Sequence, residues 1–105
     1  MIIQFNSDNN ISAHEKLTDY FTTSISEALS RFSNQITRVE VHLTDENSHK
    51  NGQKDKRCLL EARLEGMNPV VVTNHAETIE QAINGAIDKL KSSLDSELGR
   101  LKSHS

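Results

Sequence analysis

Side chains capable of metal or catalytic chemistry are spread along the 105 residues without the spacing that such chemistry needs. No two histidines stand three or four residues apart, as two ligands on one helix face would, and a single cysteine cannot make a Cys-x-x-Cys pair. There is no glycine-rich phosphate loop either, because the sequence NGAIDK falls within a predicted helix. We therefore predict no metal, no cofactor, no small-molecule substrate and no enzymatic activity. The residues concerned are His14, His42, His49, His75, His104 and Cys58.

Basic side chains on the helix predicted from residue 78 could do a different kind of chemistry, the binding of phosphate groups. At about 100° per residue, the apolar residues of this helix form one stripe, made of Ile79, Ile83, Ala86, Ile87, Leu90, Leu94, Leu98 and Leu101. Lys91 and Lys102 lie on one shoulder of the stripe. Lys89 and Arg100 lie on the other shoulder. These bases either contact RNA phosphates or are solvated flanks, since the helix dipole favours bases near a helix C-terminus.

A second group of bases follows an acidic first half of the chain. Residues 1–48 hold three bases and seven acids, whereas residues 49–63 hold five bases and two acids. The bases of the predicted loop, with Lys56 at its end, could order on RNA or simply keep a hairpin tip soluble. Arg57 and Arg63 alternate with Glu61 and could instead pair across strands. The formal net charge of −3 argues against nucleic-acid binding driven by overall positive charge.

The elements that must position these side chains follow from two periodicities. Alternating apolar residues predict strands over residues 36–46 and 57–66, and shorter strands are predicted over residues 1–5 and 70–74. Spacings of three and four predict a first helix over residues 12–33, with a capping box of Ser12 and Glu15. The second helix is predicted to begin at Thr78. This β-α-β-β-β-α order predicts an α+β fold, a four-stranded sheet with two helices packed on one face.

Several local features are predicted within this frame. The N-cap of the second helix is Thr78 paired with Gln81, or Asn74 paired with Glu77. Cys58 alternates with apolar neighbours, so we predict a buried free thiol. Glycine in mid-helix costs about 1 kcal/mol relative to alanine. Close packing against the first helix would account for the glycine at position 85.

The chain is expected to form a single domain over residues 1–105, with a mobile loop at about 45–56. No signal peptide is evident, and no apolar run approaches the roughly 20 residues that span a bilayer. We therefore expect a cytoplasmic protein without membrane association. Its oligomeric state stays open at this stage, with a monomer as the expectation.

The order of elements, the length and the stretch TIEQAINGAIDKLKSSL resemble the ribosome hibernation-promoting factor family, which includes the ribosome-associated inhibitor called protein Y. Within the stretch, Ala82-Ile83-Asn84 and Ile87-Asp88-Lys89-Leu90 are similar to the Ala-Ile-Asp and Asp-Lys-Leu of that family. Thr78 stands where members have an acidic cap. The first strand, the helix start at Ile11-Ser12 and the strand ITRVEVHL are also similar, so the resemblance covers essentially the whole chain. Because the chain ends after the second helix, it resembles the short members.

This resemblance implies a shape like that of double-stranded-RNA-binding domains. It also implies binding to the small ribosomal subunit and its rRNA near the decoding region, where members exclude mRNA and tRNA and silence translation under stress. Lys89, and also Arg31, would then be rRNA contacts. The further candidate contacts are Lys91, Arg100, Lys102, Lys56 and Arg57.

The sequence also shows departures and leaves an alternative. Where family members carry more bases, this chain has Ser92 or Ser93, Ser96 and Ala28. The alternative function is a protein–protein interaction module that has lost ribosome binding. It would use the exposed face of the sheet, with Arg38, Glu40, His42, Glu61 and Arg63.

Overall fold

The computed structural model describes residues 1–7, 15–45 and 56–103, and the side chains of all of these except 15–17 and 100–103. In chain order the elements are β1 (Ile2–Ser7), α1 (Glu15–Ala28), a 3-10 turn η1 (Ser30–Phe32), β2 (Ile36–Asp45), β3 (Lys56–Leu64), β4 (Val70–Ala76) and α2 (Ile79–Ser103). The β-α-β-β-β-α order predicted from the sequence is therefore confirmed. Most of the predicted loop, residues 46–55, lies outside the described residues, whereas its two end residues, Asp45 and Lys56, belong to strands.

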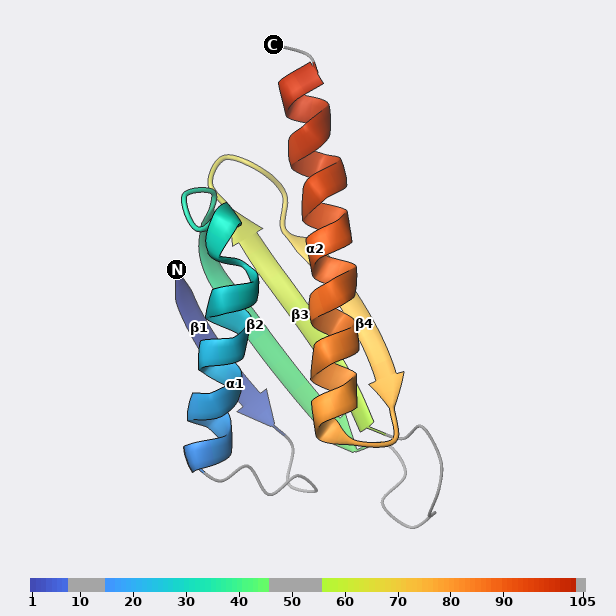
Figure 1. Cartoon of the computed structure of the whole chain (residues 1–105). Helices are drawn as coiled ribbons and strands as arrows, with labels where there is room; N and C mark the ends of the chain where they lie inside the picture. Colours follow the sequence, from blue (N-terminus) through green and yellow to red (C-terminus); the bar gives the residue numbers. More distant parts are fainter. Residues whose placement is uncertain (8–14, 46–55, 104–105) are drawn as a thin grey trace.

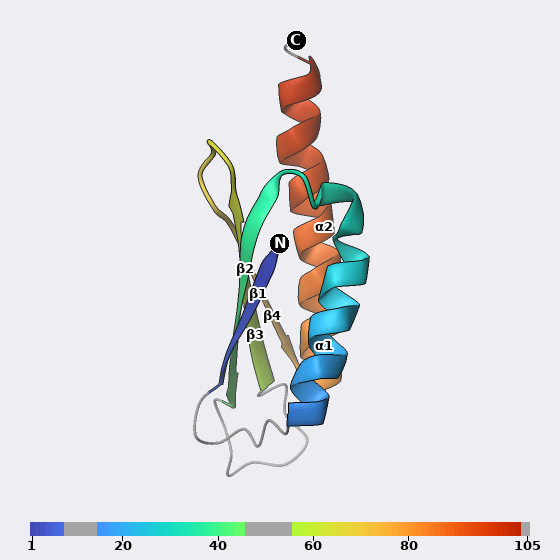
Figure 2. The ribbon, with the colours of Figure 1, turned by 90° about the vertical axis from the view of Figure 1, so that its left-hand side faces the viewer.

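The four strands form one sheet in the order β1-β2-β3-β4. β1 runs parallel to β2, and the other two neighbouring pairs are antiparallel. In Figure 1, α1 lies over β1 and β2, while α2 lies over β3 and β4 and extends beyond the end of the sheet. Figure 2 shows that both helices cover the same face, as predicted. The opposite face of the sheet carries no helix in the described part of the chain. The two edge strands of the sheet are β1 and β4.

The hydrophobic core lies between the sheet and the two helices, and the period of each element decides which residues enter it. Along β2 the buried residues alternate with half-buried ones that point to the uncovered face. The same alternation on β3 buries Cys58 completely, as predicted. Along α2 every described residue of the predicted stripe is buried or packs on the core, whereas the side chain of Leu101 lies outside the described residues. The α2 residues in the core are Ala82, Ile83, Ala86, Ile87, Leu90 and Leu94.

The end of the first helix differs from the sequence prediction. A continuous helix to residue 33 was expected, but α1 ends at Ala28 and a 3-10 turn follows. The N–H of Phe32 donates to the carbonyl of Leu29 at 2.9 Å, which is the tighter three-residue spacing. The turn lets Leu29 and Phe32 both enter the core. The capping box expected at the start of this helix involves Ser12, which lies outside the described residues.

The cap at the start of α2 is Thr78, the first of the two residues predicted. The N–H of Gln81 donates to the side-chain Oγ1 of Thr78 at 3.1 Å, and the N–H of Ala82 donates to the Thr78 carbonyl at 2.9 Å. Thr78 is therefore the N-cap. Asn74, the competing candidate, instead donates its side-chain amide to the carbonyls of Gln81 and Ala82.

Candidate RNA-contact surface

Lys89 projects from the shoulder of α2 that faces β4. The buried stripe of the helix turns toward the sheet, so a residue at the edge of the stripe is carried to the edge of the sheet. The Nζ atom of Lys89 donates a hydrogen bond to the backbone carbonyl oxygen of Thr73 on β4, at 2.9 Å. The side chain is exposed, and its ammonium group therefore lies at the surface beside the open edge of the sheet.

Arg31 belongs to the turn η1 on the other side of α2. Its Nη2 atom pairs with Asp95 of α2 at 2.7 Å, and its guanidinium lies 4.6 Å from the centre of the Phe32 ring. Both members of the ion pair are more than half exposed. Such a pair stabilises a fold by at most about 1 kcal/mol. Its clearer effect is to hold the guanidinium in place between the end of α1 and the middle of α2.

Lys91 lies on the same side of α2 as this ion pair, because it precedes Asp95 by four residues. Lys89 and Lys91 therefore face different surroundings, as the helical spacing predicted. Arg100 and Lys102 lie in the last turns of α2, but their side chains fall outside the described residues.

Lys56 and Arg57 open strand β3, at the end of the sheet that lies away from η1. Lys56 pairs with Asp45 of β2 at 3.1 Å, and the two residues face each other in the strand register. Arg57 lies between Thr44 of β2 and His75 of β4 in that register, and its side chain is half-buried. These two bases thus lie at the other end of the sheet from Arg31, whereas Lys89 bonds Thr73, two residues before His75 on β4.

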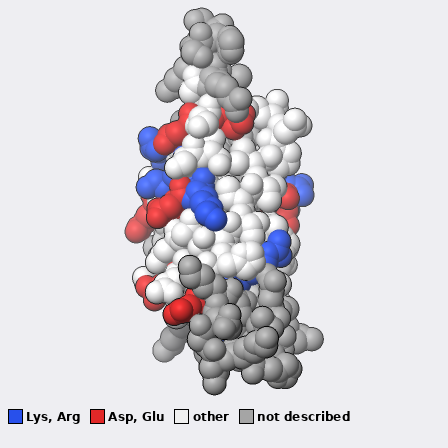
Figure 3. Space-filling model, turned by 90° about the vertical axis from the view of Figure 1, so that its right-hand side faces the viewer, with Lys and Arg blue, Asp and Glu red and all other residues white. Residues whose placement is uncertain are grey.

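The described bases form separate spots and not one continuous basic patch. Figure 3 looks onto the side of the molecule that carries the β4 edge and shows Lys and Arg side chains apart from one another, mostly with Asp or Glu side chains beside them. Neutral side chains fill the surface between. The part that β4 plays here could not be predicted from the sequence, since a backbone carbonyl such as that of Thr73 carries no side-chain signal.

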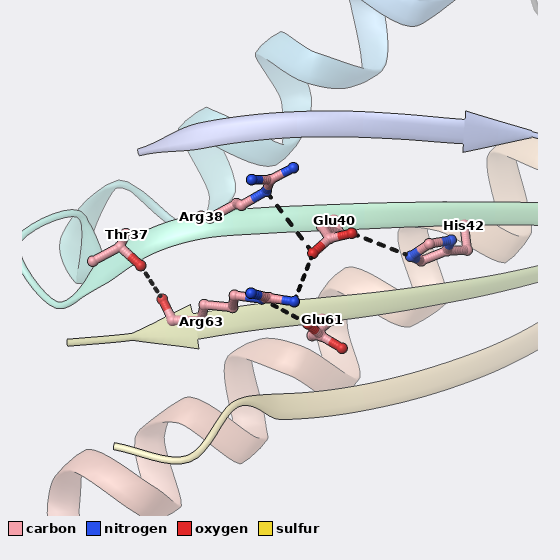
Figure 4. A network of polar contacts seen from close by, with 6 residues as sticks. All are labelled: Thr37, Arg38, Glu40, His42, Glu61 and Arg63. Atoms are coloured by element: carbon pink, nitrogen blue, oxygen red, sulfur yellow. Dashed lines mark hydrogen bonds and ion pairs between the residues drawn. The ribbon is translucent and has the colours of Figure 1, made fainter. Parts of the chain in front are cut away.

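A polar network occupies the uncovered face of the sheet, where the sequence suggested an alternative binding surface (Figure 4). Glu40 lies at its centre, with Arg63 Nη2 at 3.2 Å, His42 Nε2 at 3.7 Å and Arg38 Nε at 3.8 Å from its carboxylate oxygens. Arg63 also bonds Glu61 through Nε at 2.9 Å. The bond to Glu61 and the charge of Glu40 raise the pKa of Arg63.

These five side chains neutralise one another across β2 and β3. Glu40 and Glu61 stand opposite each other in the register, and two like charges so placed repel. Arg63 contacts both carboxylates and relieves that repulsion. The face is therefore ordered and close to neutral.

The described residues show no grouping suited to metal or thiol chemistry. No three His, Cys, Asp or Glu side chains among them could hold a metal ion. Burial raises the pKa of the Cys58 thiol to about 12, so this thiol stays protonated at neutral pH. None of the described helices is long and apolar enough to cross a membrane.

Comparison with known proteins decides the family. A family model described as "Sigma 54 modulation protein / S30EA ribosomal protein" matches residues 3–102. The chain belongs to this family. Members of the sigma 54 modulation / S30EA family are thus its relatives, which confirms the resemblance to ribosome hibernation factors that the sequence suggested. No curated protein sequence matches the chain.

Two solved structures show the same fold. The N-terminal domain of protein Y from Thermus thermophilus has a TM-score of 0.72 at 21% identity, and the match covers 91% of this chain and 98% of that chain. A ribosomal subunit interface protein from Coxiella burnetii has a TM-score of 0.72 at 15% identity, with coverage of 94% and 99%. At these identities the likeness establishes the shared α+β fold.

Proposed function

We propose that this protein is a ribosome-associated stasis factor that binds the small ribosomal subunit near its decoding region. The match to the sigma 54 modulation / S30EA ribosomal protein family over residues 3–102 is the observation that carries this proposal. The name of the structural relative from Coxiella burnetii, a ribosomal subunit interface protein, supports it. By occupying the decoding region, the protein would exclude mRNA and tRNA and silence translation under stress. This role is non-catalytic and belongs to the cytoplasm, where ribosomes work.

Contacts between a few exposed bases and rRNA phosphates supply the binding energy in this proposal. An ammonium group has three N–H donors. Lys89 uses one of them on Thr73, which leaves two for a phosphate while the helix holds the group in position. Arg31 likewise keeps donors beyond the Nη2 atom that bonds Asp95, and its guanidinium also contacts the Phe32 ring.

The acids beside these bases limit the affinity for phosphate. Asp95 lowers the local potential around Arg31, and Asp88 precedes Lys89 directly. Each phosphate contact that remains releases counterions, so the association constant falls as salt rises, with a slope set by the number of contacts.

Sedimentation with purified ribosomal subunits tests the proposal. The protein is mixed with small and large subunits at low and at moderate salt, and the gradient fractions are probed for it. We expect it to migrate with the small subunit, to dissociate as salt rises, and to be excluded from subunits already loaded with mRNA and tRNA. Protein that stays at the top of the gradient at low salt would contradict the proposal.

The uncovered sheet face is the second candidate function, as a surface for a protein partner. The observation in its favour is that its side chains are ordered by mutual ion pairs while Val71 beside them is 51% exposed. A pull-down from lysate treated with nuclease distinguishes the two functions. Partners retained after rRNA is digested, and lost in Val71→Asp, would favour the sheet face.

A further inference from the structure

Strand β4 has backbone hydrogen-bonding groups directed away from the sheet. In an antiparallel pair, the backbone groups of alternate residues point to the partner strand and those of the residues between point away. The carbonyl of Thr73 accepts its bond from Lys89, so it points away from β3. Val71, two residues earlier, must direct its N–H and C=O to the same open edge. An edge of this kind is a template for another strand.

A groove runs between this edge and helix α2. Its strand side is lined by residues 68–70 and 72–73, and its helix side by Ser92, Ser93 and Ser96. Asp88 and Lys89 lie near one end of the groove and Glu97 near the other. Serine side chains are short, so this side of α2 does not fill the space beside the strand. Figure 3 shows a largely uncharged surface in this region. The groove therefore has room for an extended segment and carries few charges that would repel one.

The composition of β4 suits strand pairing. Residues 70–73 are Val-Val-Val-Thr, all of them β-branched and uncharged, and Val71 is 51% exposed. Soluble proteins commonly protect such an edge with a lysine. Lys89 has this position here, since its ammonium covers the carbonyl of Thr73. Among the described side chains, Lys89 thus covers one outward carbonyl of the edge, and its flexible side chain can move away.

We propose that β4 pairs antiparallel with β4 of a second copy of this chain, to give one continuous sheet across two protomers. A two-fold axis at Val72 places Val71 opposite Thr73 of the second copy, and these residues are the ones whose N–H and C=O point outward. Each such pair exchanges two hydrogen bonds. The arrangement replaces the expected monomer with an isologous dimer.

The position of α2 agrees with this pairing. Neighbouring strands lie about 4.8 Å apart, and α2 lies over β3 and β4 (Figure 1). The two α2 helices of the pair would thus be about 10 Å apart, close to the usual spacing of packed helices of about 8–10 Å. Ser92 and Ser93, which lie beside both Val70 and Val72, would face their counterparts near the axis with short side chains.

Charge complementarity favours a second copy over a foreign peptide. Along the groove Lys89 lies beside Thr73, and Glu97 lies beside the start of β4. The two-fold axis reverses this order, so Lys89 of each copy approaches the Glu97 end of the other. Two opposite-charge contacts would form, one at each end of the groove. In this dimer Lys89 contacts Glu97, so only the monomer would use Lys89 on rRNA.

Proline substitution at the edge tests the pairing. Val71→Pro removes an outward N–H without removing a bond to β3, so the fold should survive, which circular dichroism checks. Val71→Thr keeps that N–H and serves as the control. In sedimentation velocity over a concentration series, wild type and Val71→Thr should move from the 11.8 kDa monomer toward twice that mass. Val71→Pro should stay monomeric.

Charge exchange tests the identity of the partner. Lys89→Glu should weaken the dimer at least tenfold, because two Glu97 side chains then face two new carboxylates. The double variant Lys89→Glu/Glu97→Lys should restore it. A wild-type chain that is monomeric at every concentration, or a Val71→Pro variant that still dimerises, would overturn the proposal. Binding of a synthetic peptide of residues 68–76 without self-association would assign the groove to a foreign strand instead.

Discussion

Gly85 on α2 lies directly against the side-chain amide of Asn74 on β4. A Cβ atom built on Gly85 would lie 2.7 Å from Asn74 Cγ and closer still to Nδ2. The amide is held there by its hydrogen bonds to the carbonyls of Ala82, at 3.2 Å, and Gln81, at 3.4 Å. The glycine thus lets α2 approach the strand, and not the first helix, as its position in the sequence had suggested.

Gly85→Ala should destabilise the protein by about 1 kcal/mol, although alanine is the better helix former. The methyl group would displace the Asn74 amide, and the loss of its hydrogen bonds outweighs the gain in helix propensity. Gly99→Ala is the matched control, because nothing lies within 4 Å of its added Cβ, and it should stabilise by up to about 1 kcal/mol. Urea unfolding followed by circular dichroism measures both. Equal effects of the two substitutions would contradict this packing.

The N-cap of α2 predicts a second stability difference. Thr78→Ala removes the oxygen that accepts the N–H of Gln81, and should lower the free energy of unfolding by about 1 kcal/mol. Thr78→Ser keeps that oxygen and should stay within about 0.5 kcal/mol of wild type. If both variants lost the same stability, the methyl group and not the cap would be responsible.

The buried thiol of Cys58 predicts a pH dependence above neutrality. Its pKa is about 12 in the folded chain against 9.0 ordinarily, because burial disfavours the thiolate. Between these values the unfolded chain binds fewer protons than the folded one, so the free energy of unfolding falls as pH rises. The Cys58 thiol lowers the free energy of unfolding by at most about 1.4 kcal/mol per pH unit in this range. Below pH 9 the thiol is protonated in both states, and its stabilising effect is fully present.

Cys58→Ala provides the comparison for this slope. The variant should be less stable overall because of the cavity it leaves, but it should lack the thiol's part of the decline between pH 9 and about pH 10.5. Urea titrations across that range give the two curves. Parallel curves would show that Cys58 does not titrate with unfolding.

A gain of ribosome affinity is expected at a position where the resemblance to ribosome hibernation factors implies a base and this chain has a serine. Ser96 is exposed on α2, two turns beyond Lys89 on the same side. Ser96→Lys should tighten binding to the small subunit on the order of tenfold and make it more sensitive to salt. Gln4→Lys adds the same charge on the uncovered sheet face and should change the affinity little. Equal gains from both would mean that net charge alone controls binding.

The fold could be predicted from the sequence because local periodicity carries most of it. The alternation Val39, Val41, Leu43 assigns β2 its buried face, and the stripe along α2 assigns that helix its packing side. The boundary at Ala28 was missed, since a 3-10 turn keeps the same apolar spacing as the end of an α-helix. Such a turn is recognised by its backbone bonds and not by its residues.

The site was predictable only in part, because its contacts join distant segments. Arg31 and Asp95 are 64 residues apart, and no local pattern relates them. The bond from Lys89 to Thr73 requires knowing that β4 is an edge strand and that α2 lies beside it. Helical spacing correctly placed Lys89 and Lys91 on different shoulders, but it could not show what each shoulder faces.

Equilibrium binding to the small ribosomal subunit as a function of salt tests the central claim, that Lys89 contacts rRNA phosphate, most directly. Two variants that each lower the net charge by one are compared with wild type, Lys89→Gln on α2 and Gln4→Glu on the uncovered sheet face. We predict that Lys89→Gln weakens binding and reduces the slope of log K against log salt by about one, while Gln4→Glu leaves the slope unchanged. Identical slopes for all three proteins would contradict the account.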